Sequence, residues 1–154
     1  MSSNPLPSLD TVEKLMQCLL GNQVEARKAA TGPDVSKPHV VARYIDDADN
    51  VQRVLICDLA LANSMGAAMS MIPSGVANEA TKAGNVGENI LGNLSEVLNI
   101  CVNLFTENGT DRLRFSDVQV CGPKNPSPAV AESVKFGVDI PRYAGGTLLA
   151  GRVG

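Results

Sequence analysis

Residues 84–108 read GNVGENILGNLSEVLNICVNLFTEN, and their apolar side chains recur at the three- and four-residue spacing of an α-helix. They fall into two neighbouring rows: Ile90, Leu94, Val97 and Cys101 in one, and Leu91, Leu98, Val102 and Phe105 in the other. Two adjacent rows form a stripe wide enough to face a hydrophobic core. The pattern therefore predicts one long amphipathic helix over 84–108.

The opposite face of this predicted helix has an unusual composition. It carries Gly92, Glu96, Asn99 and Asn103, and residues 83–111 contain no Lys or Arg. Solvated helix faces are usually built from Lys, Arg, Glu and Gln, because these residues favour the helix. Asparagine is a poor helix former, yet it occurs six times from Asn85 to Asn108. Small amide side chains suit contact with another surface, although a solvated face that became Asn-rich by drift would give the same pattern.

The composition limits the class of protein. A chain of 154 residues is long enough for one domain with a real core, and 44% hydrophobic with 19% charged residues is typical of a globular protein. Aromatic residues make up only 3%, with no Trp, so the core must be mainly aliphatic. The net charge of −3 and the lack of a basic cluster argue against nucleic-acid binding.

The cysteines and the N-terminus bear on the compartment. The cysteines have no CxxC spacing and fall within apolar runs, which favours buried thiols over metal ligands or disulfides: Cys18, Cys57, Cys101 and Cys121. The first ten residues lack the basic and apolar regions of a signal peptide. Asp58, Asn63 and Pro73 interrupt the apolar run 54–77, which predicts a strand and a helix rather than a membrane span. We therefore expect a cytoplasmic protein without membrane contact.

The other elements are predicted in chain order. Residues 1–9 form a polar tail that we expect to be flexible, and a capping-box pattern followed by helical spacing predicts a helix at about 10–30. The remaining predicted elements are strands at 39–45 and 51–62, helices at 63–72 (capped by Asn63 or Ser64) and 75–82, and strands at 112–120, 134–140 and 147–153. Gly145 and Gly146 mark either the last turn or a bulge within one long strand.

This order of elements predicts the fold class. A helix, two strands, a block of helices and three further strands argue for an α+β domain, with helices packed on a mainly antiparallel sheet. We expect residues 1–154 to form a single domain of this kind.

Most familiar catalytic motifs are missing. The chain has one His, no G-x-S-x-G, no P-loop and no cluster of His, Cys and carboxylates at metal-ligand spacing. Gly84, Gly87 and Gly92 do not match the spacing of a phosphate-binding loop, and His39 has no obvious partner in the sequence. A self-contained nucleophile and base are therefore not indicated.

The pair Glu96 and Asn99 is the candidate for chemistry. Their three-residue spacing on a helix projects both side chains in one direction. An amide can hold a water by donating and accepting hydrogen bonds, and a carboxylate beside it can bind a lysine or another cation. Phosphoryl transfer depends mostly on such positioning and on charge stabilisation. An ordinary solvated polar pair explains the same spacing.

The neighbourhood of this pair resembles the CheC/CheX family of chemotaxis phosphatases, in which a helix carries Glu-x-x-Asn. Here the motif lies in SEVLNIC, residues 95–101, and the apolar residues two, five and six positions before Glu96 are present. Glu88 and the apolar residues that follow Asn99 are also similar to CheX-type sequences. The order of predicted elements agrees in outline over most of the chain.

The resemblance implies a function. It implies binding of a phosphorylated response regulator of the CheY type, with Asn99 directing a water at the aspartyl phosphate and Glu96 engaging a lysine of the partner. The Mg²⁺ belongs to the partner, so no cofactor of this chain's own is expected. The family also implies an antiparallel sheet carrying the motif helix, and CheX-like members tend to form homodimers.

The chain departs from the family pattern, which keeps alternatives open. Gly92 stands where the family usually has Asp or Ser, Asn103 stands where it usually has a small residue, and the nearest downstream proline is displaced by two positions. A rival alignment places Asn85 and Glu88 in the paired positions, in reversed order. The alternatives are a catalytically silent CheX-like module for interaction or dimerisation, and an unrelated α+β domain that binds a small ligand.

Overall fold

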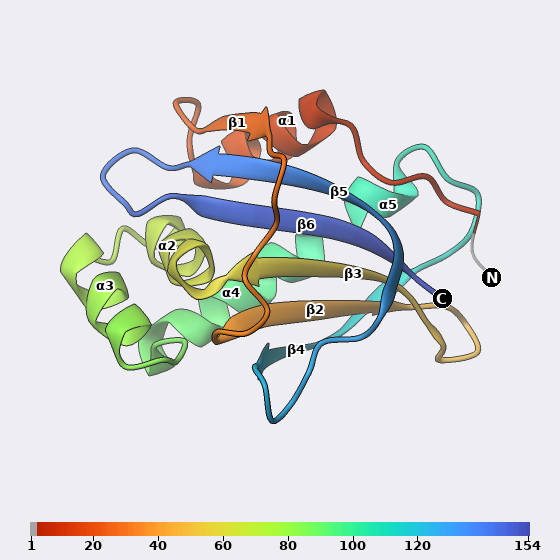
Figure 1. Ribbon diagram of the computed structural model, residues 1–154. Helices are drawn as coiled ribbons and strands as arrows, with labels where there is room; N and C mark the ends of the chain where they lie inside the picture. The colour runs from red at the N-terminus through yellow and green to blue at the C-terminus, as the bar shows by residue number, and fades with distance from the viewer. Residues whose placement is uncertain (1–2) are drawn as a thin grey trace.

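The sheet of this protein is antiparallel throughout. The computed structural model describes residues 3–154. Its six strands follow the order β1-β5-β6-β3-β2-β4, and every neighbouring pair runs antiparallel (Figure 1). The strands are β1 (Glu25–Lys28), β2 (His39–Ile45), β3 (Val51–Asp58), β4 (Arg114–Cys121), β5 (Val130–Asp139) and β6 (Gly146–Val153).

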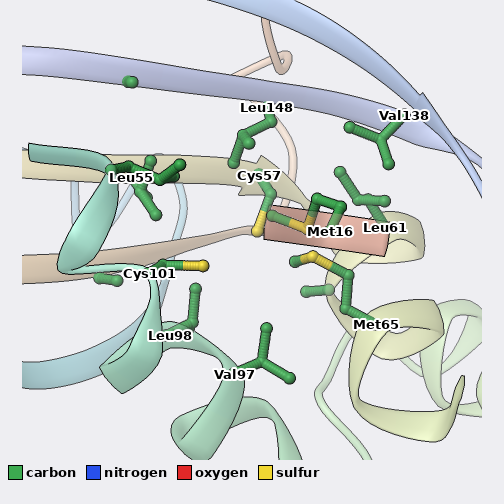
Figure 2. Packing of buried hydrophobic residues seen from close by; sticks show 14 of the residues in the cluster. Met16, Leu55, Cys57, Leu61, Met65, Val97, Leu98, Cys101, Val138 and Leu148 are labelled. Atoms are coloured by element: carbon green, nitrogen blue, oxygen red, sulfur yellow. The ribbon is translucent and has the colours of Figure 1, made fainter. Parts of the chain in front are cut away.

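The helices supply the second layer. They are α1 (Leu9–Leu20), α2 (Leu59–Met69), α3 (Ser74–Lys82), α4 (Glu88–Ile100) and the short α5 (Asn103–Thr106). Buried residues of α1, α2, α4 and α5 pack on one face of the sheet and form the main core with residues of β2, β3, β5 and β6 (Figure 2). The predicted α+β fold with helices on an antiparallel sheet is therefore confirmed.

The opposite face of the sheet carries a smaller apolar cluster. Val41, Val54, Ile56 and Cys121 are buried on this side. The connection from β1 to β2 crosses this face, and Gly32 within it approaches Leu149 of β6 (Figure 1). Both faces of the central strands are thus covered, which explains their nearly continuous apolar sequences.

The first helix is shorter than predicted. The expected helix at 10–30 ends at Leu20, because Gly21 adopts a φ of 122° that a helix does not contain. Glu25–Lys28 then forms β1, which pairs with β5 at the edge of the sheet. Ahead of the helix, Asn4 is 1% exposed and exchanges hydrogen bonds with the backbone of Asp111, so this part of the predicted tail packs against the domain.

Asp58 sets the boundary between β3 and α2. The predicted strand 51–62 ends here, because the Asp58 carboxylate accepts a hydrogen bond from the Leu61 amide and caps the helix. The same carboxylate accepts hydrogen bonds from the amide and hydroxyl of Thr147 in β6. The prediction that Asn63 or Ser64 would cap this helix is therefore wrong.

Two predictions about the later elements are also corrected. The helix predicted over 84–108 consists of α4 and α5, separated by a break at 101–102. Gly145 belongs to the turn between β5 and β6 and Gly146 begins β6, so the alternative of one long bulged strand is wrong.

The structure also bears on the expected burial of the cysteine thiols and on the expectation that no segment spans a membrane. Cys57, Cys101 and Cys121 are buried, whereas Cys18 is exposed on α1. Burial raises the pKa of the Cys101 thiol to about 12 and that of Cys57 still further, so both act as small neutral hydrophobes. In residues 3–154, no helix combines the length and the hydropathy needed to cross a membrane.

The exposed face of helix α4 as candidate functional site

Helix α4 is fixed against α2 at its middle. Gly66 of α2 leaves so little space that a methyl group on it would lie 2.5 Å from Cγ2 of Ile90 and 2.9 Å from the Ile90 carbonyl oxygen. Beside this contact, the Asn93 amide donates hydrogen bonds to the Gly66 carbonyl at 3.0 Å and to the Ser70 hydroxyl at 2.8 Å. These contacts fix the orientation of α4 about its own axis.

Asn63 fixes the beginning of α4. Its side chain is fully buried, and its amide nitrogen donates to the Asn85 carbonyl and to the Thr81 hydroxyl, each at 3.0 Å. Its amide oxygen accepts from the Gly87 backbone N–H at 3.1 Å. The hydrogen bonds of this buried amide therefore reach the last turn of α3 and the α3–α4 connection, which positions the first turn of α4.

Tyr44 of β2 fixes the other end. Its buried hydroxyl donates to the Leu98 carbonyl at 2.6 Å, and its ring packs against Phe105 and Phe115. Burial raises the pKa of Tyr44 well above its usual value, so the hydroxyl remains a donor at neutral pH. The Val102 amide bonds to the Asn99 carbonyl, and α4 ends at Ile100. The Tyr44 hydroxyl thus replaces the backbone N–H donor that the Leu98 carbonyl lacks, because carbonyls in the last turn of a helix have no partner within the helix.

Tyr44→Phe is expected to lower the free energy of unfolding by about 1 kcal/mol, because it leaves the buried Leu98 carbonyl without its donor. Amide exchange in the last turn of α4 should accelerate. Tyr143→Phe is a matched control, because the Tyr143 hydroxyl also donates to a carbonyl at 2.6 Å, that of Ile72 beyond α2. Urea denaturation and hydrogen exchange measure both effects. Equal exchange at α4 in the two variants would contradict the role given to Tyr44.

Glu96 and Asn99 lie side by side on the outer face of α4. Both are exposed, and within residues 3–154 neither side chain makes a hydrogen bond or ion pair. Residues three apart on a helix have Cβ atoms about 5–6 Å apart, so both side chains can reach one bound group. The predicted geometry of the pair is present, and its catalytic role stays a prediction.

The rival pair lies about two to three helical turns earlier. Asn85 is in the connection before α4, and Glu88 is the first residue of the helix. Both side chains are exposed and line a groove of about 430 Å³ between α4 and the edge strand β4. Asn85 and Glu88 are therefore close in space, but only Glu96 and Asn99 share a continuous helix.

The buried side of α4 agrees with the sequence prediction except at one position. The row Ile90, Leu94, Val97 and Cys101 is completely buried. Leu91, predicted in the second row, is 44% exposed and lines the groove beside β4. Sequence spacing also gave no indication of the anchoring roles of Asn63 and Tyr44, because their partners are distant in the chain.

Across residues 3–154, the other residue types considered for catalysis or metal binding do not form a second site. His39 at the start of β2 is completely buried, and its Nδ1 is 2.8 Å from the Lys37 carbonyl oxygen. In the described part of the chain, no group of three or more His, Cys, Asp or Glu residues is placed to hold a metal ion. The outer face of α4 is anionic, because Glu88 and Glu96 lie in a segment without Lys or Arg.

The comparisons with known proteins concern the fold. No family model matches the chain, and no curated protein matches its sequence. Among solved structures, a chain of the CheX–CheY–BeF3–Mg²⁺ complex of Borrelia burgdorferi is 14% identical, with a TM-score of 0.58 over 94% of this chain and 93% of that chain.

Two further solved structures agree with this result. FliY of Thermotoga maritima is 16% identical, with a TM-score of 0.59 over 94% of this chain and 83% of that chain. A CheC-like superfamily protein from Shewanella sp. PV-4 is 12% identical, with a TM-score of 0.53 over 96% of both chains. The helices on a six-stranded antiparallel sheet, with α4 packed across it, therefore form a CheC/CheX-like fold.

Proposed function

We propose that this protein binds a phosphorylated response regulator of the CheY type through the outer face of α4 and hydrolyses its aspartyl phosphate. The observation that carries the proposal is the pair Glu96 and Asn99, exposed side by side on a helix that is anchored at both ends and at its middle. A helix anchored in this way presents the two side chains at a fixed spacing, so its backbone needs no rearrangement when a partner arrives.

The proposed reaction needs little from this chain beyond positioning. The Asn99 amide would hold a water in line with the phosphorus–oxygen bond of the aspartyl phosphate, accepting from one O–H and donating to the water oxygen. Attack of that water would release the aspartate carboxylate and inorganic phosphate. Glu96 would pair with an active-site lysine of the partner and so fix the approach of the two proteins. A Mg²⁺ carried by the partner would stabilise charge on the phosphoryl oxygens.

The electrostatics of the face support a partner that brings positive charge. Glu88 and Glu96 are its charged groups, and residues 83–111 contain no cation that would repel a lysine or a metal-loaded site. Opposite charges across an interface accelerate association and select the orientation. The fold is also that of a chain in a solved complex with CheY.

A second candidate function is binding without hydrolysis, as a receiver-binding or self-associating module. The specific observation in its favour is the groove beside Asn85 and Glu88, which carries the paired residue types in reversed order. If that groove is equivalent to the catalytic position of CheC/CheX proteins, a water-directing amide would face the wrong part of the partner. The fold would then serve recognition alone.

The experiment follows the loss of phosphate from a CheY-type receiver domain phosphorylated with acetyl phosphate in the presence of Mg²⁺. The wild-type protein should accelerate this loss above the receiver's own rate, and a Glu96→Ala/Asn99→Ala double variant should not. Equal rates with and without the wild-type protein would contradict hydrolysis. Binding to a beryllofluoride-loaded receiver, measured in parallel, would then decide between the silent module and no interaction.

A further inference from the structure

Leu91 is an apolar side chain in an unexpected place. Its spacing fits the core row of α4, yet it is 44% exposed. Val120 of β4, 37% exposed, lines the same groove of about 430 Å³. Among the large hydrophobic residues exposed in the described chain, these two share one groove, whereas Val35, Met71 and Val76 lie elsewhere. Neighbouring exposed apolar side chains are typical of an interaction surface.

The groove borders the proposed catalytic pair. A helix turns about 100° per residue, which places Leu91, Glu88, Asn99 and Gly92 in that order around α4, with Glu96 next. Leu91 and Asn99 are eight residues apart, which corresponds to about 12 Å along the axis. A standard interface covers about 800 Å² on each partner. A protein docked on Asn99 would therefore also cover the groove.

Gly92 lies between these features and leaves the helix backbone bare. It is exposed, and a methyl group placed on it would meet no other atom within 4 Å. Packing inside this protein therefore gives no reason for glycine in the middle of α4, where it weakens the helix. Contact with a partner protein would explain the glycine, because a residue without a side chain lets a backbone or side chain of the partner approach closely.

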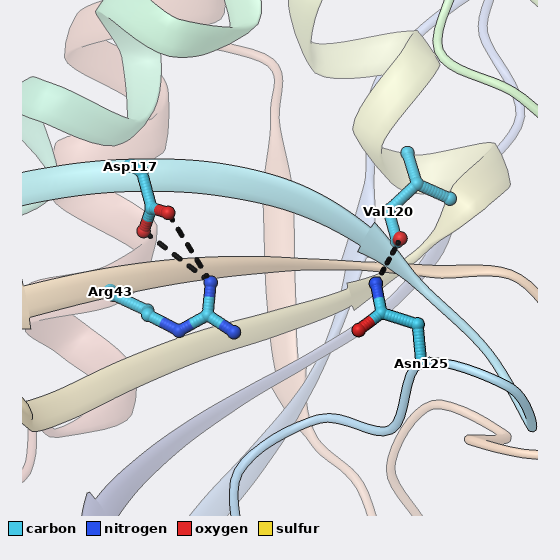
Figure 3. A network of polar contacts seen from close by, with 4 residues as sticks. All are labelled: Arg43, Asp117, Val120 and Asn125. Atoms are coloured by element: carbon cyan, nitrogen blue, oxygen red, sulfur yellow. Dashed lines mark hydrogen bonds and ion pairs between the residues drawn. The ribbon is translucent and has the colours of Figure 1, made fainter.

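The charge of the groove argues against a second copy of this chain as the occupant. Glu88 is its acidic lining residue, and no lining residue is basic. The end of β4 is also covered, because the Asn125 side chain of the β4–β5 loop donates to the Val120 carbonyl at 3.3 Å (Figure 3). A β-bridge also joins Gly122 to Asn125. An ion pair of 3.4 Å between Arg43 Nη1 and Asp117 Oδ1 links β2 to β4 along this edge (Figure 3). This end of the edge strand is poorly suited to strand addition.

We infer that Leu91 and Val120 anchor an apolar side chain of the receiver domain, while Glu88 meets a basic residue beside it. The inference rests on the proposed function and names the contacts that hold that partner. Exposed polar pairs such as Glu96 and Asn99 contribute little to affinity by themselves, whereas apolar anchors in a groove dominate the binding energy of an interface. The groove therefore provides most of the affinity, whereas the polar pair provides the chemistry and, through Glu96, a smaller contribution to binding.

The test measures the affinity for a receiver domain loaded with beryllofluoride and Mg²⁺ by calorimetry. Leu91→Asn should weaken binding about tenfold or more, because truncating an apolar anchor has effects of this size. Gly92→Gln should weaken binding similarly by steric block, with no loss of thermal stability, because its side chain meets open space. Val76→Asn, an exposed valine on α3, is the matched control and should bind like the wild type.

The outcomes separate the two proposals. No binding by the wild-type protein would overturn the proposed function together with this inference. Wild-type binding that Leu91→Asn and Gly92→Gln leave unchanged would overturn the inference alone. Sedimentation of the free protein completes the test: a dimer that Leu91→Asn converts to a monomer would show that the occupant is a second copy, which also overturns the inference.

Discussion

Asn99→Ala is expected to lower the rate of receiver dephosphorylation about 100-fold while changing the affinity for the beryllofluoride-loaded receiver by less than about threefold. Misplacing a reacting group by about 1 Å is enough for a loss of this size. The alanine side chain can no longer hold the attacking water. Because that water acts in the transition state, its loss should appear in kcat rather than in binding.

Glu96→Ala should behave differently from Asn99→Ala. The carboxylate is proposed to pair with a lysine of the bound partner before reaction, so its removal should weaken binding and lower the rate together. Asn78→Ala is the matched control, because Asn78 is an exposed asparagine on α3, away from the outer face of α4. Loss of affinity without loss of kcat in Asn99→Ala would contradict the assignment of the water-directing role. An unchanged rate in Glu96→Ala would contradict the lysine contact.

The sequence predicted the buried side of α4 well because periodicity is a local signal. The row from Ile90 to Cys101 is buried, and Glu96 and Asn99 are exposed, as a helix facing a core requires. The break after Ile100 could not be predicted in this way. It coincides with a hydrogen bond from Tyr44, which is 54 residues away in the sequence and reaches the Leu98 carbonyl only after the sheet has formed.

The groove between α4 and β4 could not be predicted from the sequence either, because it depends on contacts between distant parts of the chain. Leu91 has the spacing of a core residue, and only the position of β4 at the sheet edge decides that it stays exposed. β4 pairs with β2, which precedes it by about 75 residues with four helices between them. Non-local pairings of this kind are not encoded in local patterns. The early end of α1 was missed because helical spacing continues past Gly21, whereas the backbone does not.

Gly66→Ala is expected to destabilise the protein by about 2 kcal/mol, although alanine is the better helix former. The added methyl group would lie 2.5 Å from Cγ2 of Ile90 and 2.9 Å from the Ile90 carbonyl oxygen, and the backbone oxygen cannot move without moving α4. Overpacking of a close helix contact costs about 1–3 kcal/mol and occasionally more. The higher helix propensity of alanine offsets at most about 1 kcal/mol of this cost.

Gly92→Ala is the matched control for this prediction, because both substitutions add one methyl group within a helix. Gly92 faces open space, so its replacement should stabilise the protein by up to about 1 kcal/mol. Urea denaturation of the two variants should thus give shifts of opposite sign. Stabilisation by Gly66→Ala would mean that α2 and α4 pack less closely than described. Because α4 carries Glu96 and Asn99, Gly66→Ala should also slow receiver dephosphorylation from outside the proposed interface, since Gly66 is buried where α2 packs on α4.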